Sequence, residues 1–340
     1  MLYGGLARRK ASLALLWQSF LVSAVISFQW WVCGYTLAYS PTAGRFIGDF
    51  RHVGLKDVTA KPIGYLPEIL FALFQCFFCV VTVQIMIGGA LERGQLMPSL
   101  VFAFIWATVV YCPIACWTWN SKGWLFNLPS LDYAGGGPVH IASGMSALAY
   151  ALVLGKRVEH GAKRRPHNIT MVFLGTCFIW FGWLAFNGGS TLNATVRTMY
   201  EMLVGGLSVV ILYLTAENRY AMFNTNIAAS TGVVGWVLTD YFRKNGKFSV
   251  VSACEGAIAG LVGITPAAGY VPVWSAALIG FVTAVVCAAL GDVTKWVNID
   301  EGMDVFKLHG IGGIIGSILT GIFADSSSMF LPPCTGRCLF

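Results

Sequence analysis

Long apolar runs separated by short polar links account for most of the chain. A run of about 18 or more apolar residues is long enough to cross the hydrocarbon core of a bilayer as a helix. A further apolar stretch at 201–216 is not expected to cross. The pattern therefore predicts an all-α polytopic membrane protein with nine spans, near residues 13–39, 67–91, 97–118, 137–155, 170–190, 221–242, 250–268, 271–291 and 305–324.

The basic residues give the predicted orientation. If the nine spans alternate, most of the Lys and Arg residues fall on one side, which the positive-inside rule identifies as cytoplasmic. A crossing at 201–216 would place residues 243–247 outside, so we predict that this stretch does not cross. The basic segments expected inside are "RRK" at 8–10, Arg93, "KRVEHGAKRR" at 156–165, "RKNGK" at 243–247, Lys295 and Lys307.

Composition narrows the possible functions. Charged residues make up 11% of the chain, against roughly 25% in soluble domains. The net charge of +7 is interpreted as a topology signal, with attraction to anionic lipid headgroups second, and nucleic acid is not an expected partner. Neither a metal-ligand cluster nor a Ser/His/Asp arrangement is apparent, so we expect no cofactor and no enzyme.

Two histidines interrupt the apolar pattern. His140 lies in the fourth predicted span and His309 in the ninth, each just before a run of small residues. Because the two spans are five apart, they cross the bilayer in opposite senses. That relation is typical of inverted-topology repeats, which place the functional site near the midplane between the two halves.

A purely structural interpretation is that each histidine hydrogen-bonds a neighbouring helix. Polar groups at this depth are costly, so two of them at repeat-related positions favour a functional pair. Imidazoles donate, accept and exchange protons near neutral pH without a permanent charge. The pair therefore suits the passage of a small polar solute that loses or passes on a proton.

The segments around both histidines resemble the signature regions of the ammonium transporter family (Amt/Mep/Rh), especially its fungal Mep branch. They are "LDYAGGGPVH" at 131–140 and "LHGIGGIIG" at 308–316. The resemblance runs from residue 1 to about 324, and it is carried as well by "YGGLARRK", "GALERG", "GWLAFNGGS" and "GAIAGLVGITPAAGYV".

The resemblance implies the inverted-repeat ammonium-transporter fold, with about nine of the usual eleven spans present. We expect residues 1–324 to form one transmembrane domain whose first span is incomplete. Residues 198–219 interrupt the family pattern and are interpreted as a non-family insertion. Residues 325–340 are interpreted as a divergent tail that replaces the last span.

The resemblance also implies an outer cation site. Phe78 and Trp119 would hold an ammonium ion by cation–π attraction, and Ser190 would accept a hydrogen bond from it. Phe78 and Phe186 would stack as a gate below that site. Without the resemblance, the aromatic residues are more simply explained by packing or interface anchoring, and Ser190 by helix capping.

Below the gate, the resemblance places His140 and His309 along a narrow pore, where they share a hydrogen bond. Asp132 matches an acidic residue near the vestibule. It is expected to favour a cation electrostatically and to fix the local backbone rather than to bind substrate. Asp132 as a simple helix N-cap is compatible with that role.

The expected function is membrane transport of ammonium, with methylammonium as an analogue, in a homotrimer of the plasma membrane. Ammonium would be recruited as the cation, deprotonated, and conducted as ammonia past the histidines. Whether the proton is released or relayed is left open by the sequence. The alternatives are a truncated relative that acts as a sensor or regulatory subunit, an inactive product, or a channel for neutral gas.

Overall fold

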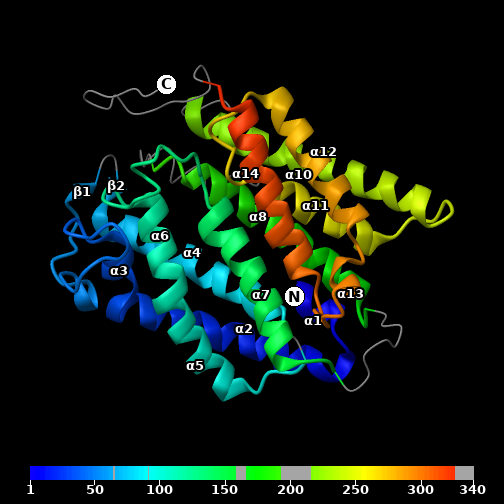
Figure 1. Ribbon diagram of the computed structural model, residues 1–340, viewed down its shortest axis with the longest axis horizontal. Coiled ribbons are helices and arrows are strands. Elements are labelled where there is room, and N and C mark those ends of the chain that lie inside the picture. The colour runs from blue at the N-terminus through cyan, green and yellow to red at the C-terminus, as the bar shows by residue number, and fades with distance from the viewer. Residues whose placement is uncertain (64–65, 91, 158–165, 193–215, 326–340) are drawn as a thin grey trace.

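The computed structural model describes residues 1–63, 66–90, 92–157, 166–192 and 216–325, and helices dominate these ranges (Figure 1). The first element of the first half is α1 (Leu2–Leu6). A short hairpin of β1 (Pro62–Ile63) and β2 (Leu66–Pro67) precedes α4. The other elements of this half are α2 (Arg9–Gln29), η1 (Trp30–Gly34), α3 (Tyr35–Tyr39), η2 (Val53–Leu55), α4 (Glu68–Gly88), α5 (Leu96–Trp106), η3 (Ala107–Tyr111), α6 (Cys112–Trp119), η4 (Gly136–Ile141) and α7 (Ala142–Leu154).

The second half is also helical. It contains α8 (Ile169–Gly189), α10 (Ala216–Arg243), α11 (Val250–Ile264), α12 (Val273–Ala289), α13 (Val293–Trp296), η6 (Phe306–Ile311) and α14 (Gly312–Phe323).

Each predicted span corresponds to a helix or to a continuous series of helical elements. Seven of these, in the described part of the chain, are long and apolar enough to cross a membrane. The other two are α10, which carries several asparagines in its first half, and α11, which is shorter. Helix α11 ends at Ile264, four residues before the predicted end, because Pro266 lacks the N–H donor that would continue the helical hydrogen bonds.

Two of the sequence interpretations concern segments that are largely outside the described residues. Of the interpreted insertion at 198–219, only the backbone of 216–219 is described, as the start of α10. Of the interpreted tail at 325–340, only Asp325 is described.

The helices form two halves that meet around η4–α7 and η6–α14. In Figure 1 the blue-to-cyan elements α2 to α6 occupy one side and the yellow-to-red elements α10 to α14 the other. One hydrophobic cluster lies mainly among α2 to α6, and two others lie among α8 to α14. The contacts cross between the halves, since η4 packs on α14 and η6 packs on α7. This arrangement confirms the predicted all-α inverted-repeat fold.

Glycines allow these helices to pack backbone to backbone. A Cβ atom added at Gly144 of α7 would lie 2.1 Å from the Gly310 nitrogen of η6, and one at Gly316 of α14 would lie 2.4 Å from the Gly263 oxygen of α11. Such contacts leave no room for a side chain, which is how small residues bring membrane helices together.

A chain of ion pairs joins segments that precede or follow these helices. Glu92 accepts a bond of 3.1 Å from the Arg8 Nε, and it lies 3.7 Å from an Arg157 guanidinium nitrogen. Arg157 in turn donates from Nε to an Asp300 carboxylate oxygen at 2.8 Å. The links before α2, after α4, after α7 and before η6 are therefore tied together on the face predicted to be cytoplasmic.

Candidate functional site

Both histidines lie in widened, π-helical turns that interrupt otherwise α-helical segments. His140 belongs to η4 and donates its N–H to the carbonyl of Gly135, five residues earlier. His309 belongs to η6, where Gly312 donates to the carbonyl of Lys307, also five residues earlier. Such π-turns within α-helices occur frequently at functional sites.

The two imidazole rings meet at the boundary between the halves. Their Nδ1 atoms are 3.2 Å apart, and both side chains are buried, at 1% exposed for His140 and 7% for His309. One Nδ1 must donate while the other accepts, so the neutral pair holds a single proton between these atoms. The His140 Nε2 atom has no hydrogen-bond partner in the described part of the chain.

Trp183 completes the surroundings of the first histidine. Its ring stacks on His140, with centroids 5.2 Å apart and planes at 18°. The indole N–H donates to the Thr265 hydroxyl at 2.9 Å, which holds the ring in place. Trp183 lies within "GWLAFNGGS", but no role was predicted for it. Its position one helical turn before Phe186 is the only feature of the sequence that indicates a place near the site.

The aromatic residues expected at an outer site come together in the structure. The rings of Phe78 and Phe186 are stacked, with centroids 4.0 Å apart and planes at 18°. The Trp119 ring stands edge-on to Phe78, with centroids 5.8 Å apart. Trp183 lies 5.8 Å from Phe186. A continuous series of rings therefore leads from Trp119 to His140.

Ser190 lies one helical turn beyond Phe186, at the end of α8. Its hydroxyl donates to the Phe186 carbonyl at 2.9 Å, so its oxygen lone pairs remain able to accept. The backbone N–H of Ser190 donates to the backbone carbonyl of Asn187 at 3.2 Å. This bonding suits a helix end and fixes the position of the hydroxyl.

Asp132 organises the start of η4. One carboxylate oxygen accepts from the amides of Gly135 at 2.7 Å and Gly136 at 2.8 Å, and the other accepts from Gly137 at 2.7 Å. The Asp132 carbonyl also accepts from the Trp119 indole at 3.1 Å. Burial raises the pKa of the Asp132 carboxyl, and the three amide donors oppose that rise.

The glycines after Asp132 are required by this geometry. Gly135 has a φ of 114°, which residues with a side chain rarely adopt. A Cβ atom at Gly136 would lie 2.8 Å from Pro266 and 2.9 Å from the Ser317 hydroxyl. The three successive glycines thus present their amides to one carboxylate and let η4 approach α14 and the segment that follows α11.

A cavity of about 620 Å³ adjoins Phe186. His140, His309, Trp183 and Phe186 line it, together with apolar side chains from α1, α2, α4, α8 and α11. Phe78, Trp119 and Ser190 do not line it. The stacked phenyl rings therefore lie between the Trp119 region and a mostly apolar cavity that contains both imidazoles.

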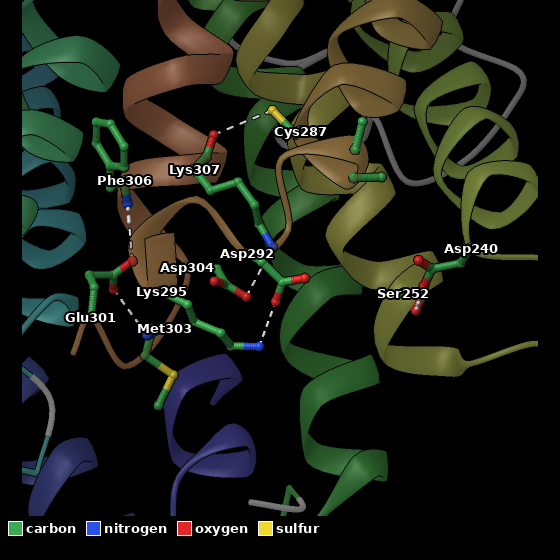
Figure 2. Close-up of polar contacts among 12 residues, drawn as sticks. Asp240, Ser252, Cys287, Asp292, Lys295, Glu301, Met303, Asp304, Phe306 and Lys307 are labelled. Carbon is green, nitrogen blue, oxygen red and sulfur yellow. Dashed lines mark hydrogen bonds and ion pairs between the residues drawn. The ribbon is translucent and has the colours of Figure 1, made fainter. Parts of the chain in front are cut away.

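Charged residues cluster around the start of η6 (Figure 2). The two oxygens of Glu301 accept from the amides of Met303 at 3.0 Å and Phe306 at 3.3 Å. The Lys307 ammonium is 3.0 Å from an Asp304 carboxylate oxygen. Burial, and then the charge of Asp304, raise the pKa of Glu301 to about 7.

Comparison with known proteins identifies the family. The sequence model that describes the Ammonium Transporter Family matches residues 1–336. The chain belongs to the ammonium transporter family. It is 49% identical over 333 residues to the ammonium transporter MEP2 of Saccharomyces cerevisiae, covering 95% of this chain and 63% of that protein. It is 45% identical to ammonium transporter 1 of Schizosaccharomyces pombe, covering 95% of this chain and 61% of the relative.

Solved structures of family members have the same fold. The crystal structure of Candida albicans Mep2 matches with a TM-score of 0.85 and 46% identity, covering 96% of this chain and 69% of that chain. Saccharomyces cerevisiae Mep2 matches with a TM-score of 0.84 and 48% identity, covering 96% of this chain and 72% of that chain. Family membership and the membrane-length helices confirm the predicted multi-pass protein of the plasma membrane.

Two further observations bear on the site. The chain spans a little over 60% of the length of the two curated family members compared above. Within the residues that the structure describes, there is no group of three or more His, Cys, Asp or Glu side chains that could hold a metal ion.

Proposed function

We propose that this chain transports ammonium across the membrane through the cavity that contains His140 and His309. Ammonium arrives as the cation and binds at Trp119 and Phe78, whose ring faces attract it. The Ser190 hydroxyl oxygen accepts a hydrogen bond from the ion. The relatives named as ammonium transporters and the edge-on approach of Trp119 to Phe78 support this assignment.

Deprotonation follows from the cost of moving a charge into an apolar cavity. A bare cation loses several kcal/mol or more of solvation there, whereas neutral ammonia loses far less. The stacked rings of Phe78 and Phe186 separate the outer site from the cavity and admit only a small, dehydrated solute. Ammonium gives up its proton at this gate, and ammonia crosses as the neutral molecule.

The imidazole pair provides polar contacts along the apolar route. Ammonia both donates and accepts hydrogen bonds, and neutral imidazoles offer both functions without trapping a cation. The observation that carries the proposal is the Nδ1–Nδ1 distance of 3.2 Å within the wall of the cavity. Asp132 contributes by holding the backbone of η4, on which His140 stands.

Uptake of labelled methylammonium into cells lacking their own carriers tests this function. The chain should give saturable uptake, and His140→Ala should lower it about tenfold or abolish discrimination against other monovalent cations. His167→Ala is the matched control, because His167 does not line the cavity and contacts the Ala7 carbonyl. Full, saturable uptake with unchanged ion discrimination in His140→Ala would contradict the role of the imidazole pair.

Sensing is the second candidate function. A structure described as a sensor Amt protein matches with a TM-score of 0.84 at 26% identity, covering 96% of this chain. Ammonium binding by the purified chain without uptake in cells would favour this alternative. We also propose a homotrimer with one pore per subunit, which the mass of the detergent-solubilised protein tests.

A further inference from the structure

One ionisable side chain lies in an otherwise uncharged helix beside the cavity. Glu255 is the only charged residue of α11, and its side chain lines the cavity together with His140 and His309. It is half-buried and has neither a hydrogen bond nor an ion pair with any described residue. An ionisable residue inside a membrane segment is costly, and such residues commonly mark ion or proton routes.

The neighbouring carboxylates, by contrast, have partners. Asp304 is 3.0 Å from the Lys307 ammonium, and Asp240 accepts from the hydroxyl of Ser252 and from the Lys244 ammonium. Figure 2 shows the Asp304–Lys307 and Asp240–Ser252 contacts. Their oxygens are thus engaged in protein contacts, whereas those of Glu255 remain available to a solute or a proton.

Four charged side chains act electrostatically on Glu255. Two of them, Lys307 and Lys244, are basic, and the other two, Asp304 and Asp240, are acidic. Lys307 is 3% exposed, and its ammonium also lies 5.0 Å from the centre of the Trp236 ring. The two positive and two negative neighbours offset each other, so they present no large net charge to this carboxyl.

Glu255 also lies in the part of the cavity lining that is closest to the predicted cytoplasmic side. Phe186 lies near the end of α8, which the alternation of the predicted spans assigns to the outer side, and Glu255 lies near the start of α11, which it assigns to the cytoplasmic side. Glu255, Met303 and Val305 line the part formed by the start of α11 and the link before η6. Both segments adjoin loops that the charge pattern assigns to the cytoplasmic side. Ammonia that has passed the imidazoles meets this carboxyl before it leaves.

We infer that Glu255 is the inner proton-exchange group of the transport route, an inference that rests on the proposed function. The Glu255 carboxyl O–H bond breaks as an N–H bond forms on the departing ammonia, which yields ammonium and a carboxylate. The proton that the outer ammonium gave up then reprotonates the carboxylate after passing along the His140–His309 pair. Each cycle delivers one ammonium ion and therefore one positive charge.

Infrared difference spectroscopy of the purified chain tests the exchange without requiring transport. Addition of ammonium should remove intensity from the carbonyl band of a protonated carboxyl, and Glu255→Gln should abolish that change. Glu68→Gln is the matched control, because Glu68 is a half-buried glutamate of α4 that does not line the cavity and is not among the charges acting on Glu255. A wild-type spectrum without a carboxyl change, or one unaffected by Glu255→Gln, would overturn the inference.

Electrical recording on reconstituted vesicles separates this inference from the proposed function. Glu255→Gln should lower the ammonium-driven current at least tenfold, while Glu255→Asp, which keeps a carboxyl, should retain a substantial part of it. Wild-type current that Glu255→Gln leaves unchanged would refute the role of Glu255 and leave the proposed function standing. Absence of uptake and current in the wild type would refute the proposed function, and the infrared result would then decide the exchange alone.

Discussion

The backbones of Gly144 and Gly310 touch where α7 crosses η6. A Cβ atom at Gly144 would lie 2.1 Å from the Gly310 nitrogen and 2.5 Å from its Cα. Gly144 is four residues after His140, and Gly310 directly follows His309. The distance between the two histidine-bearing helices is therefore determined by a contact between their backbones, with no side chain between them.

Gly144→Ala should push α7 away from η6 and separate the imidazoles. Overpacking of this kind costs roughly 1–3 kcal/mol, so both the unfolding temperature in detergent and methylammonium uptake should fall. Gly321→Ala is the control, because Gly321 in α14 has open space around it and alanine favours a helix over glycine by up to about 1 kcal/mol. Equal behaviour of the two variants would show that the crossing does not set the pore.

Trp183 should contribute to transport by stacking on His140 in an orientation that its hydrogen bond to Thr265 fixes. Trp183→Phe keeps a ring over His140 but loses the hydrogen bond to Thr265, which contributes about 1 kcal/mol. We expect uptake to fall severalfold in Trp183→Phe and further in Trp183→Ala. Thr265→Val removes the same hydrogen bond from the other side, so it should reproduce the Trp183→Phe phenotype. A Thr265→Val variant with the same uptake as the wild type would refute this explanation.

The Arg157–Asp300 pair should stabilise the junction between the two halves. The Asp300 side chain is 3% exposed, and Arg157 donates to it through Nε and a terminal guanidinium nitrogen. Arg157→Lys loses this two-point geometry and should cost about 1–3 kcal/mol, measured by thermal unfolding in detergent. Lys295→Arg, which also keeps the positive charge, provides the comparison, because the side chains of the Lys295–Asp292 pair are 74% and 43% exposed. Exposed pairs contribute below about 1 kcal/mol.

Stability should fall with rising pH because of Glu301. Its folded-state pKa of about 7 lies above the ordinary value of 4.5, so the folded chain keeps a proton that the unfolded chain has released. The resulting stabilisation is complete below the ordinary value and is lost as the pH rises through about 7. The whole effect amounts to at most about 3 kcal/mol.

Glu301→Gln, which stays neutral, should flatten this dependence when unfolding temperatures are compared between about pH 5 and about pH 8. Gln offers only one acceptor oxygen to the amides of Met303 and Phe306, so a uniform loss of stability at every pH is also expected. A variant whose unfolding temperature declines with pH as steeply as that of the wild type would exclude Glu301 as the source.

The spans could be predicted from the sequence because lipid demands long apolar helices, and the structure has a helix for each of the nine. The pairing of His140 with His309 was also predictable, since inverted repeats bring equivalent positions together. Asp132 was considered as a simple helix N-cap; its carboxylate accepts from the amides of Gly135 and Gly136, but the residue at the N-cap position of η4 is Gly135. The spans and the meeting of the two histidines were predictable because they depend on a strong local pattern and on the relation between the repeats.

Other features depend on tertiary packing and left no local signal. Trp183 is one of 12 tryptophans, and nothing in its neighbours distinguishes a ring that stacks on an imidazole from one that faces lipid. Glu255 is a single acidic residue among small ones, and only the cavity shows that it lies beside the histidines. The widened turns η4 and η6 cannot be predicted from hydropathy, because π and α turns accommodate the same residues.

Those widened turns have a consequence for how homologous chains should be aligned. Successive residues of a regular helix differ in direction by about 100°, and a π-turn contains one residue more than the α-helical turn it replaces. Deleting one residue between Gly136 and Ile141 would turn the preceding segment by that angle relative to α7 and re-aim its polar groups. A one-residue gap at this place therefore indicates a different pore lining, even where every other motif is retained.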